Sequence, residues 1–342
     1  MTAAVAVDLG KTGCRAVLWT GGTADAGLAH DVHEVPGAPG LAADNGVAAA
    51  RAAVRAAVLP LLPRLQGGHG GRLDAVCVGA AGAATAPEAA RALAALLIED
   101  LPADEVAVTS DAVTAHAGAL GGRTGVVLAI GTGSVAIGIG DDGSYARVDG
   151  WGPWLGDEGS GAWIGAAGLR AALRAHDGRG PHTALLAAAA ERFGDPDRLP
   201  AALGRDGNPA RTAASFAPQV ARAAAAGDDI ATTIVRDAAA ALGEAALTAA
   251  RRIAGGDALP VTVTGGLTGL GEPLTGPLTA ALTGSPRPLH LRPPLGDPLD
   301  GARLLALDAS APHEPHVARL RRTTALPTVP TPPVTSPAVI QE

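Results

Sequence analysis

Aromatic residues are scarce in this chain of 342 residues, in which four tryptophans, two phenylalanines and one tyrosine make up 2% of the sequence. So few rings argue against base stacking as a general means of binding nucleic acid. The net charge of −7 argues against it too, because nucleic-acid binding needs a basic surface. We therefore expect no nucleic-acid partner.

Cysteine and long apolar runs are also rare. Cys14 and Cys77 each stand in a short apolar run and form no CxxC pair, so we expect buried core thiols rather than ligands of zinc or an iron–sulfur cluster. No apolar run reaches the length of a membrane span. The apolar start, residues 3–7, is too short for a signal peptide and lacks its basic beginning. The sequence predicts a cytoplasmic protein with no membrane partner.

The order of apolar runs and alanine-rich segments predicts an α/β protein built from two similar halves. In the first half we expect strands at 3–8, 14–19, 27–35, 73–79 and 105–109, and helices at 47–64, 86–100 and 112–119. In the second half we expect strands at 126–130, 135–140, 145–149 and 260–264, and helices at 161–176, 182–193, 210–226, 230–254 and 298–308. Because each half opens with three short strands, the pattern indicates a duplicated domain.

These halves set the expected domain boundaries. The first domain is expected at residues 1–120 and the second at 121–311, and the chain is long enough for each to bury its own core. Residues 312–342 are rich in proline and threonine, so we expect a disordered tail there.

Two glycine turns join expected strands, one at the start of each half. The turn at 10–12 resembles the end of a Walker A loop, but position 5 is valine instead of glycine and a strand follows in place of a helix. The turn at 131–134 matches a loose dinucleotide-binding pattern and is also followed by a strand. Backbone N–H groups and hydroxyls in such turns can hold phosphate oxygens. Taken alone, each is better explained as a plain hairpin turn, but the pair favours a nucleotide clamped between the halves. The candidate phosphate contacts are Gly10, Lys11, Thr12, Gly131, Thr132, Gly133 and Ser134.

Three further features surround these turns. Asp8 stands at the head of the first turn, where a carboxylate can hold hydrated Mg²⁺ beside phosphates. Lys11 is the only lysine of the chain; either its charge reaches a phosphate or its rarity reflects a composition poor in lysine. The pair Gly265-Gly266 follows a late strand and either lets a purine lie flat on the backbone or forms a strand-to-helix loop.

The segment 150–165 concentrates unusual residues: three of the four tryptophans, six glycines and the acid pair Asp157-Glu158. Rigid aromatic walls, carboxylates and close backbone approach suit a pocket for a hydroxyl-rich ligand. Asp157 and Ser160 are also explained as caps of the helix expected at 161–176, and both roles can coexist. This segment is the first candidate for a ligand site.

Asp8–Thr12, Gly131–Ser134, the Trp-Gly-x-x-Leu-Gly-Asp-Glu-Gly-Ser run at 151–160 and Gly265-Gly266 together resemble the N-acetylglucosamine kinase branch of the BadF/BadG/BcrA/BcrD ATPase family. The resemblance implies the actin/Hsp70/hexokinase type of fold, in which two ribonuclease-H-like domains close around a cleft. It implies ATP and Mg²⁺ as cofactors and transfer of phosphate to the 6-hydroxyl of N-acetylglucosamine. A homodimer is a possible assembly, since relatives often dimerise.

The same resemblance assigns roles to single residues. It makes Asp111 the catalytic base that accepts the proton of the sugar hydroxyl, although an aspartate at this position taken alone is explained as a helix N-cap. It makes Asp157 a partner of sugar hydroxyls. It also implies sugar contacts at Gly82, Thr132 and Trp151, with Thr132 near the phosphate as well.

Two departures from the family pattern bear on the substrate. Relatives usually have glycine where Lys11 stands and often a basic or polar residue where Gly13 stands. The loop Pro36–Gly40 stands where relatives supply an asparagine to the sugar, and Asn45 comes several residues later. A kinase for glucosamine, muramic acid or another hexosamine is therefore the alternative. An ATPase that activates a dehydratase, which needs cluster-binding cysteines, and a non-catalytic sugar sensor are the further alternatives.

Overall fold

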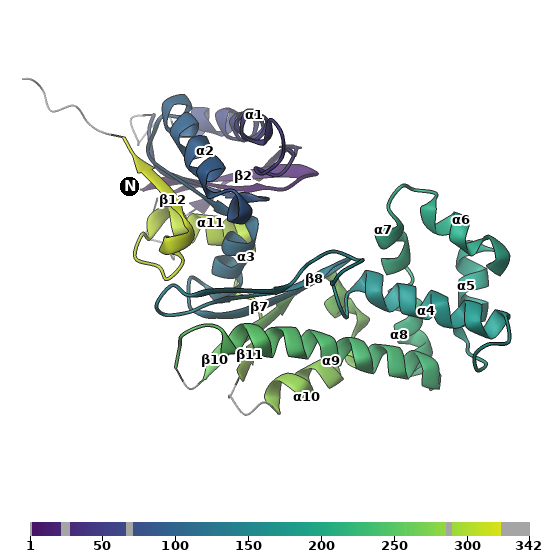
Figure 1. Ribbon diagram of the computed structural model, residues 1–342. Helices are drawn as coiled ribbons and strands as arrows, with labels where there is room; N and C mark the ends of the chain where they lie inside the picture. Colours follow the sequence, from purple (N-terminus) through teal and green to yellow (C-terminus); the bar gives the residue numbers. More distant parts are fainter. Residues whose placement is uncertain (1, 22–27, 66–70, 257, 285–288, 323–342) are drawn as a thin grey trace, which may run out of the picture.

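The computed structural model describes residues 2–21, 28–65, 71–256, 258–284 and 289–322. Two β-sheets with helices between and outside them give five layers (Figure 1). The outer helices over the first sheet are α1 (Gly46–Val58) and α2 (Pro87–Asp100). Between the sheets lie α3 (Asp111–Leu120) and α11 (Pro298–Leu307), and beyond the second sheet lie α9 (Asp229–Arg251) and α10 (Glu272–Thr283).

The first sheet has the strand order β12-β6-β5-β1-β2-β3, with β4 also paired to β2. Strands β1, β5 and β6 are parallel, while β2 runs antiparallel to β1. Small apolar side chains alternate along β1, so that Val5 and Val7 pack towards α1 and α2, and Ala4 and Ala6 towards α3 and α11. The strands are β1 (Ala3–Leu9), β2 (Gly13–Thr20), β3 (Leu28–Ala29), β4 (His33–Pro36), β5 (Leu73–Ala80), β6 (Ala103–Ser110) and β12 (Ala318–Arg321).

The second sheet repeats this arrangement. Its order is β11-β10-β7-β8-β9, so three antiparallel strands again lead into parallel ones, as in β4-β2-β1-β5-β6. This match confirms the predicted duplication of a ribonuclease-H-like unit. The strands are β7 (Gly125–Ile130), β8 (Ser134–Ile139), β9 (Tyr145–Asp149), β10 (Leu259–Thr264) and β11 (Leu289–Arg292).

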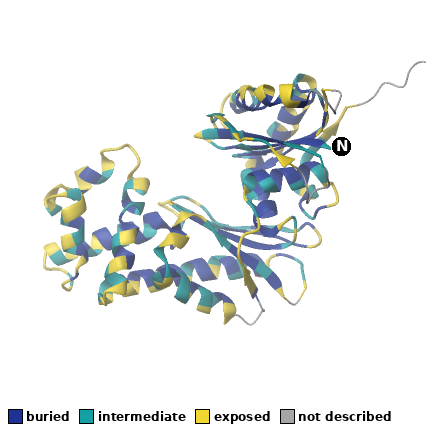
Figure 2. Ribbon diagram, turned by 180° about the vertical axis from the view of Figure 1, so that it is seen from behind, coloured by how far each residue is buried: buried dark blue, intermediate teal, exposed yellow. Residues whose placement is uncertain are grey.

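A helical arm extends from the second sheet, with mostly exposed outer surfaces (Figure 2). The helix expected at 210–226 is two helices in the structure. The chain breaks at Ser215 and Phe216, where the Phe216 ring is fully buried and Pro218 begins a new first turn. The arm consists of α4 (Gly161–His176), α5 (Leu185–Phe193), α6 (Leu199–Gly204), α7 (Pro209–Ala214) and α8 (Ala217–Ala225).

The predicted start of the tail at residue 312 is wrong. Residues 318–321 form β12, which pairs antiparallel with β6 and so extends the first sheet. Arg319 explains why this polar segment is ordered, since its guanidinium is largely buried between Glu105 and Glu314. The rest of the expected tail, 323–342, lies outside the described residues.

The predicted boundary of the second domain at residue 311 is also wrong. Helix α11, which we assigned to that domain, packs on α3 and on β1 and β5 of the first sheet. The chain therefore returns to the first lobe after β11, and the C-terminal segment belongs to that lobe.

One helical run among the described residues, Gly46–Leu65, is long and apolar enough to cross a membrane by length and composition alone. This corrects the expectation that no run reaches that length. In the structure, Ala50, Val54, Ala57 and Val58 of this run are buried in the core against the first sheet. Arg51 and Arg55 on its outer side bind Asp100 of α2, as expected for a core helix of an α/β layer.

Candidate active site

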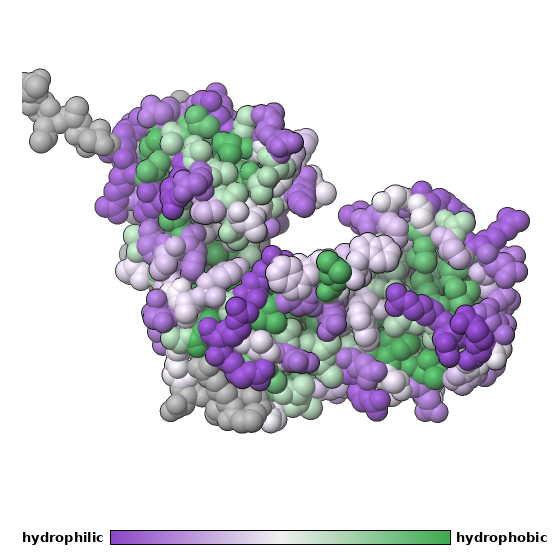
Figure 3. Space-filling model, viewed as in Figure 1, coloured by the Kyte–Doolittle hydropathy of each residue, from purple (hydrophilic) through white to green (hydrophobic). Residues whose placement is uncertain are grey.

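A cleft of about 720 Å³ opens where the parallel strands of both sheets end. On the surface, the molecule is hollowed between the first lobe and the helical arm (Figure 3). The cleft brings together predicted residues from both halves of the chain, which are Asp8, Gly82, Asp111, Gly131, Gly133, Ser134, Asp157 and Gly265.

The other predicted residues lie outside the lining of this cleft, and they are Gly10, Lys11, Thr12, Thr132, Trp151 and Gly266. Lys11 and Thr132 are exposed at the tips of the two glycine turns. The side chain of Trp151 is 66% exposed and stacks on Arg147, with 4.9 Å from the guanidinium carbon to the ring centre. The tip of the second turn borders the cleft, because Gly131 and Gly133 on either side of Thr132 line it, whereas no residue of the first turn does.

Asp111 is the first residue of α3, directly after β6. The cap of this helix is the residue before it, Ser110, whose Oγ accepts a hydrogen bond from the N–H of Val113 at 3.2 Å. Asp111 Oδ1 accepts one from the N–H of Ala112 at 2.9 Å. Because Ser110 performs the capping, the carboxylate of Asp111 is free to face the cleft.

Burial raises the pKa of Asp111 above its ordinary value, and the negative charge of Asp8 raises it further. The hydrogen bond from Ala112 and the charge of Lys11 act in the opposite direction. A carboxylate with a raised pKa is a better proton acceptor at neutral pH than an ordinary aspartate. Asp111 thus has the environment of a general base.

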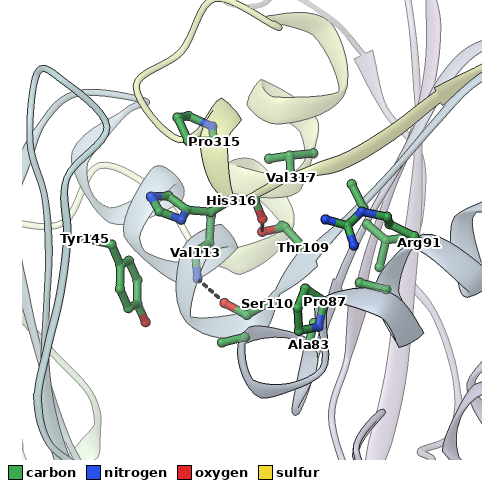
Figure 4. Close-up of a pocket in the computed structure, with 14 residues that line it drawn as sticks. Ala83, Pro87, Arg91, Thr109, Ser110, Val113, Tyr145, Pro315, His316 and Val317 are labelled. Carbon is green, nitrogen blue, oxygen red and sulfur yellow. Dashed lines mark hydrogen bonds between the residues drawn. The ribbon is translucent and has the colours of Figure 1, made fainter.

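A smaller cavity of about 220 Å³ adjoins the cleft and shares Ala84, Ser110 and Tyr145 with it (Figure 4). Thr109 Oγ1 donates a hydrogen bond to the adjacent carbonyl oxygen of His316 at 2.7 Å. The C-terminal segment that returns to the first lobe thereby fixes the end of β6, directly before Asp111.

Asp8 lies near the end of β1 and accepts a hydrogen bond from Arg15 at 2.7 Å. The two residues face each other across the β1–β2 pair. The sequence analysis did not predict this contact, although the register of a β1–β2 hairpin would have indicated it. The other oxygen of a carboxylate so bound can still face a metal ion. In the part of the chain that the structure describes, no group of three or more His, Cys, Asp or Glu side chains forms a metal site. A magnesium ion at Asp8 would take its remaining ligands from phosphates and water, as this ion commonly does.

The β7–β8 turn rests on the start of α4. The N–H of Gly161 donates to Gly131 O at 2.9 Å, and that of Ala162 donates to Thr132 O at 3.1 Å. Ser134 Oγ donates to Glu158 O at 2.9 Å, so this hydroxyl, expected to hold phosphate, is bound within the protein. Backbone groups are left as the main donors of this turn. The backbone of Gly265 lies close to the end of β7, since a Cβ on Gly265 would lie 2.2 Å from Ile130 O.

Residues 150–158, which we name the tryptophan loop, connect β9 to the turn before α4. Ser160 caps α4 by accepting a hydrogen bond from the N–H of Trp163 at 3.2 Å, so the capping role belongs to Ser160. Asp157 instead turns its carboxylate to the β7–β8 turn, where a Cβ on Gly133 would lie 2.6 Å from Asp157 Oδ2. This contact places a cleft-lining acid beside the predicted phosphate site.

Two residues that sequence reasoning missed, Tyr145 and Arg147, also line the cleft. They are two positions apart on β9, with buried Ala146 between them pointing to the other face. This alternation is the signal that could have found them. Asn45 lies elsewhere, beside a separate surface hollow at the start of α1.

Comparisons with known proteins identify the family and support the fold. The sequence model of the BadF/BadG/BcrA/BcrD ATPase family matches residues 5–273, well over half of the chain. The chain belongs to this family. This chain is also similar to a structure solved as a candidate N-acetylglucosamine kinase from Chromobacterium violaceum. The two are 30% identical, with a TM-score of 0.62, over 89% of this chain and 99% of that one. The likeness confirms the predicted actin-like fold.

Two curated relatives match parts of the BadF-type chain. The N-acetylmuramic acid/N-acetylglucosamine kinase of Clostridium acetobutylicum is 36% identical over 81 residues, which are 24% of this chain and 26% of that protein. The N-acetyl-D-glucosamine kinase of Dictyostelium discoideum is 32% identical over 139 residues, which are 40% and 44% of the two chains. The matched segments thus span less than half the length of these relatives.

The two cysteines help to distinguish a kinase of this family from an ATPase that activates a dehydratase. Both Cys14 and Cys77 are buried in the first sheet, and burial raises the pKa of each thiol to about 12. Thiols with such pKa values stay protonated, whereas a metal cluster binds thiolates. The prediction of core thiols is confirmed, and a cluster-bearing dehydratase activator is disfavoured.

Proposed function

We propose that this protein is an ATP-dependent amino-sugar kinase that phosphorylates the 6-hydroxyl of N-acetylglucosamine. The observation that carries the proposal is the position of Asp111, in one cleft with Asp8 at the head of the first glycine turn, with the β7–β8 turn and with Asp157 of the tryptophan loop. A proton acceptor, a phosphate-binding backbone and a hydroxyl-binding acid are the three elements that phosphoryl transfer to a sugar requires. The kinase names of the similar proteins support it.

In this mechanism, Asp157 binds sugar hydroxyls and orients the 6-hydroxyl towards Asp111. As the oxygen attacks the γ-phosphorus of ATP, Asp111 Oδ accepts the hydroxyl proton, a new P–O bond forms and the bond to ADP breaks. The backbone of the β1–β2 and β7–β8 turns binds the phosphates. Magnesium, when bound with ATP, neutralises part of the phosphate charge, and Asp8 is the residue that would hold it.

The loop Pro36–Gly40 is the reason to test other amino sugars in the same assay. The loop Pro36–Gly40 packs on the first glycine turn, with the N–H of Ala38 donating to Gly10 O at 3.2 Å, and it carries no side-chain amide. One missing hydrogen bond in a pocket can redirect specificity strongly. Glucosamine and N-acetylmuramic acid are therefore the alternative substrates.

A coupled assay of ADP release tests the proposal, with N-acetylglucosamine, glucosamine, N-acetylmuramic acid, N-acetylmannosamine and glucose as acceptors. We expect ADP release with amino sugars, fastest with N-acetylglucosamine. No release with any acceptor would reject the kinase proposal. Sugar binding in a calorimeter without ADP release would instead support the non-catalytic sugar sensor.

A further inference from the structure

Asp149, the last residue of β9, binds both ends of the tryptophan loop. Its Oδ1 accepts hydrogen bonds from the N–H groups of Asp157 at 2.8 Å and Trp151 at 3.5 Å. Its Oδ2 accepts one from the N–H of Glu158 at 2.8 Å. A single carboxylate thus joins residues on either side of the loop, and it does so without lining the cleft itself.

The surrounding backbone is shaped to admit this carboxylate. A Cβ on Gly156 would lie 2.1 Å from Asp149 Oδ1, so the loop can close on the carboxylate only with glycine at that position. Asp149 and Asp157 both have positive φ angles, 62° and 55°, which non-glycine residues seldom adopt. Hydrogen bonds to a charged acceptor can offset such strain, because they are among the stronger ones in proteins.

The position of the sugar-facing acid depends on these contacts. The main-chain N–H of Asp157 donates to Asp149 Oδ1 on the β9 side, and Asp157 Oδ1 accepts a long hydrogen bond from the N–H of Gly152 at 3.4 Å. On the other side, Ser134 Oγ fixes the neighbouring carbonyl of Glu158. Arg147 also holds the start of the tryptophan loop, since it donates a hydrogen bond to Gly150 O and stacks on the ring of Trp151.

We propose that Asp149 is a positioning residue that holds the tryptophan loop, and with it Asp157, in the geometry that binds the sugar. The inference rests on the proposed kinase function and adds to it a determinant of sugar affinity. Asp149 acts through Asp157 and touches neither sugar nor nucleotide. Its removal should therefore weaken sugar binding and leave ATP binding unchanged.

The test is Asp149→Gly, because glycine adopts a φ near 62° without strain and the change removes the side chain that carries the carboxylate. We expect the KM for N-acetylglucosamine to rise about tenfold, since a misplaced contact group loses binding. The KM for ATP should stay within about twofold of the wild type, and kcat should change less than the sugar KM. Asp149→Asn keeps the Oδ1 acceptor for Asp157 and should restore part of the affinity.

Asp142→Gly is the matched control. Asp142 Oδ1 accepts a hydrogen bond from the N–H of Ser144 at 2.8 Å in the turn at the other end of β9, far along the strand from the tryptophan loop. This variant should keep the wild-type KM for both substrates. An Asp149→Gly enzyme with unchanged sugar KM would overturn the inference, as would a parallel rise of both KM values with a lower Tm. A wild-type protein that releases no ADP would reject the kinase proposal itself, and the inference with it.

Discussion

At the scale of single residues, a serine beside each candidate aspartate caps the neighbouring helix, so the aspartate itself is not needed as a cap. Ser110 caps α3 beside Asp111, and Ser160 caps α4 close to Asp157. From the sequence, Asp111 taken alone is explained as a helix N-cap and only the family resemblance makes it a base, while for Asp157 capping and a ligand contact can coexist. The structure resolves this ambiguity, because only the hydrogen-bond partners show which side chain satisfies the helix.

Asp111→Asn should abolish turnover and keep ATP binding. The amide has nearly the same shape but cannot accept the hydroxyl proton, so kcat should fall by about 10²–10⁴-fold. Steady-state ADP release and calorimetric titration with ATP measure the two effects. Turnover close to that of the wild type would rule out Asp111 as the base.

The same variant should be more stable than the wild type at neutral pH. The folded protein raises the pKa of Asp111, mainly by burial, so the folded state binds this proton more strongly than the unfolded state. Stability is therefore lost as pH rises above the ordinary aspartate value of 3.8 through the raised folded pKa. Thermal unfolding should give Asp111→Asn the higher Tm at pH 7 and a smaller difference below pH 3.8. An equal or lower Tm at pH 7 would contradict the burial argument.

Much of the candidate site followed from local sequence patterns. The β7–β8 glycine turn, Asp8, Asp111 and Asp157 are marked by their neighbours in the chain, and the structure brings these residues to one cleft. Arg15 and Arg147 were missed for a physical reason, since their contacts depend on strand pairing and strand alternation rather than on a local motif.

At the scale of elements, long apolar or alanine-rich segments were predictable and short or interrupted ones were not. Helix α10 was not predicted because Pro273 and Pro277 interrupt its helical pattern. Of the two, Pro273 stands in the first turn, where proline is tolerated. Strands β11 and β12 have four residues each and carry several polar side chains. Their sheet partners decide that they are strands, and no periodicity of four residues can show this.

The crossing of α3 and α11 between the two sheets depends on close backbone approach. A Cβ on Gly118 would lie 1.9 Å from Asp297 O, and a Cβ on Gly301 would lie 1.9 Å from Thr114 O. Gly118→Ala should therefore force the helices apart and cost about 1–3 kcal/mol of unfolding free energy, as overpacking does. Denaturant unfolding measures this loss.

Gly204→Ala is the control for that substitution. Gly204 ends α6, and a Cβ there would meet no atom within 4 Å. The control should unfold like the wild type. Equal stability of the Gly118→Ala and Gly204→Ala variants would show that the crossing can relax at no cost.

At the scale of the whole molecule, two copies of one fold are joined so that the ends of their parallel strands share a cleft. The last part of the chain returns to the first lobe, where β12 extends its sheet and α11 packs between both sheets (Figure 1). Duplication was readable from the sequence because both halves repeat an order of elements. The return of the chain to the first lobe could not be predicted from the sequence, because a strand of four residues after a proline-rich turn resembles the start of a tail.

The central claim is that this cleft transfers phosphate from ATP to the 6-hydroxyl of an amino sugar. The most direct measurement is ³¹P–¹H correlation NMR of the product formed from N-acetylglucosamine and ATP. The account predicts a new phosphate signal coupled to the two protons on carbon 6, together with ADP. A phosphate coupled to the anomeric proton, or ADP without any phosphorylated sugar, would contradict it.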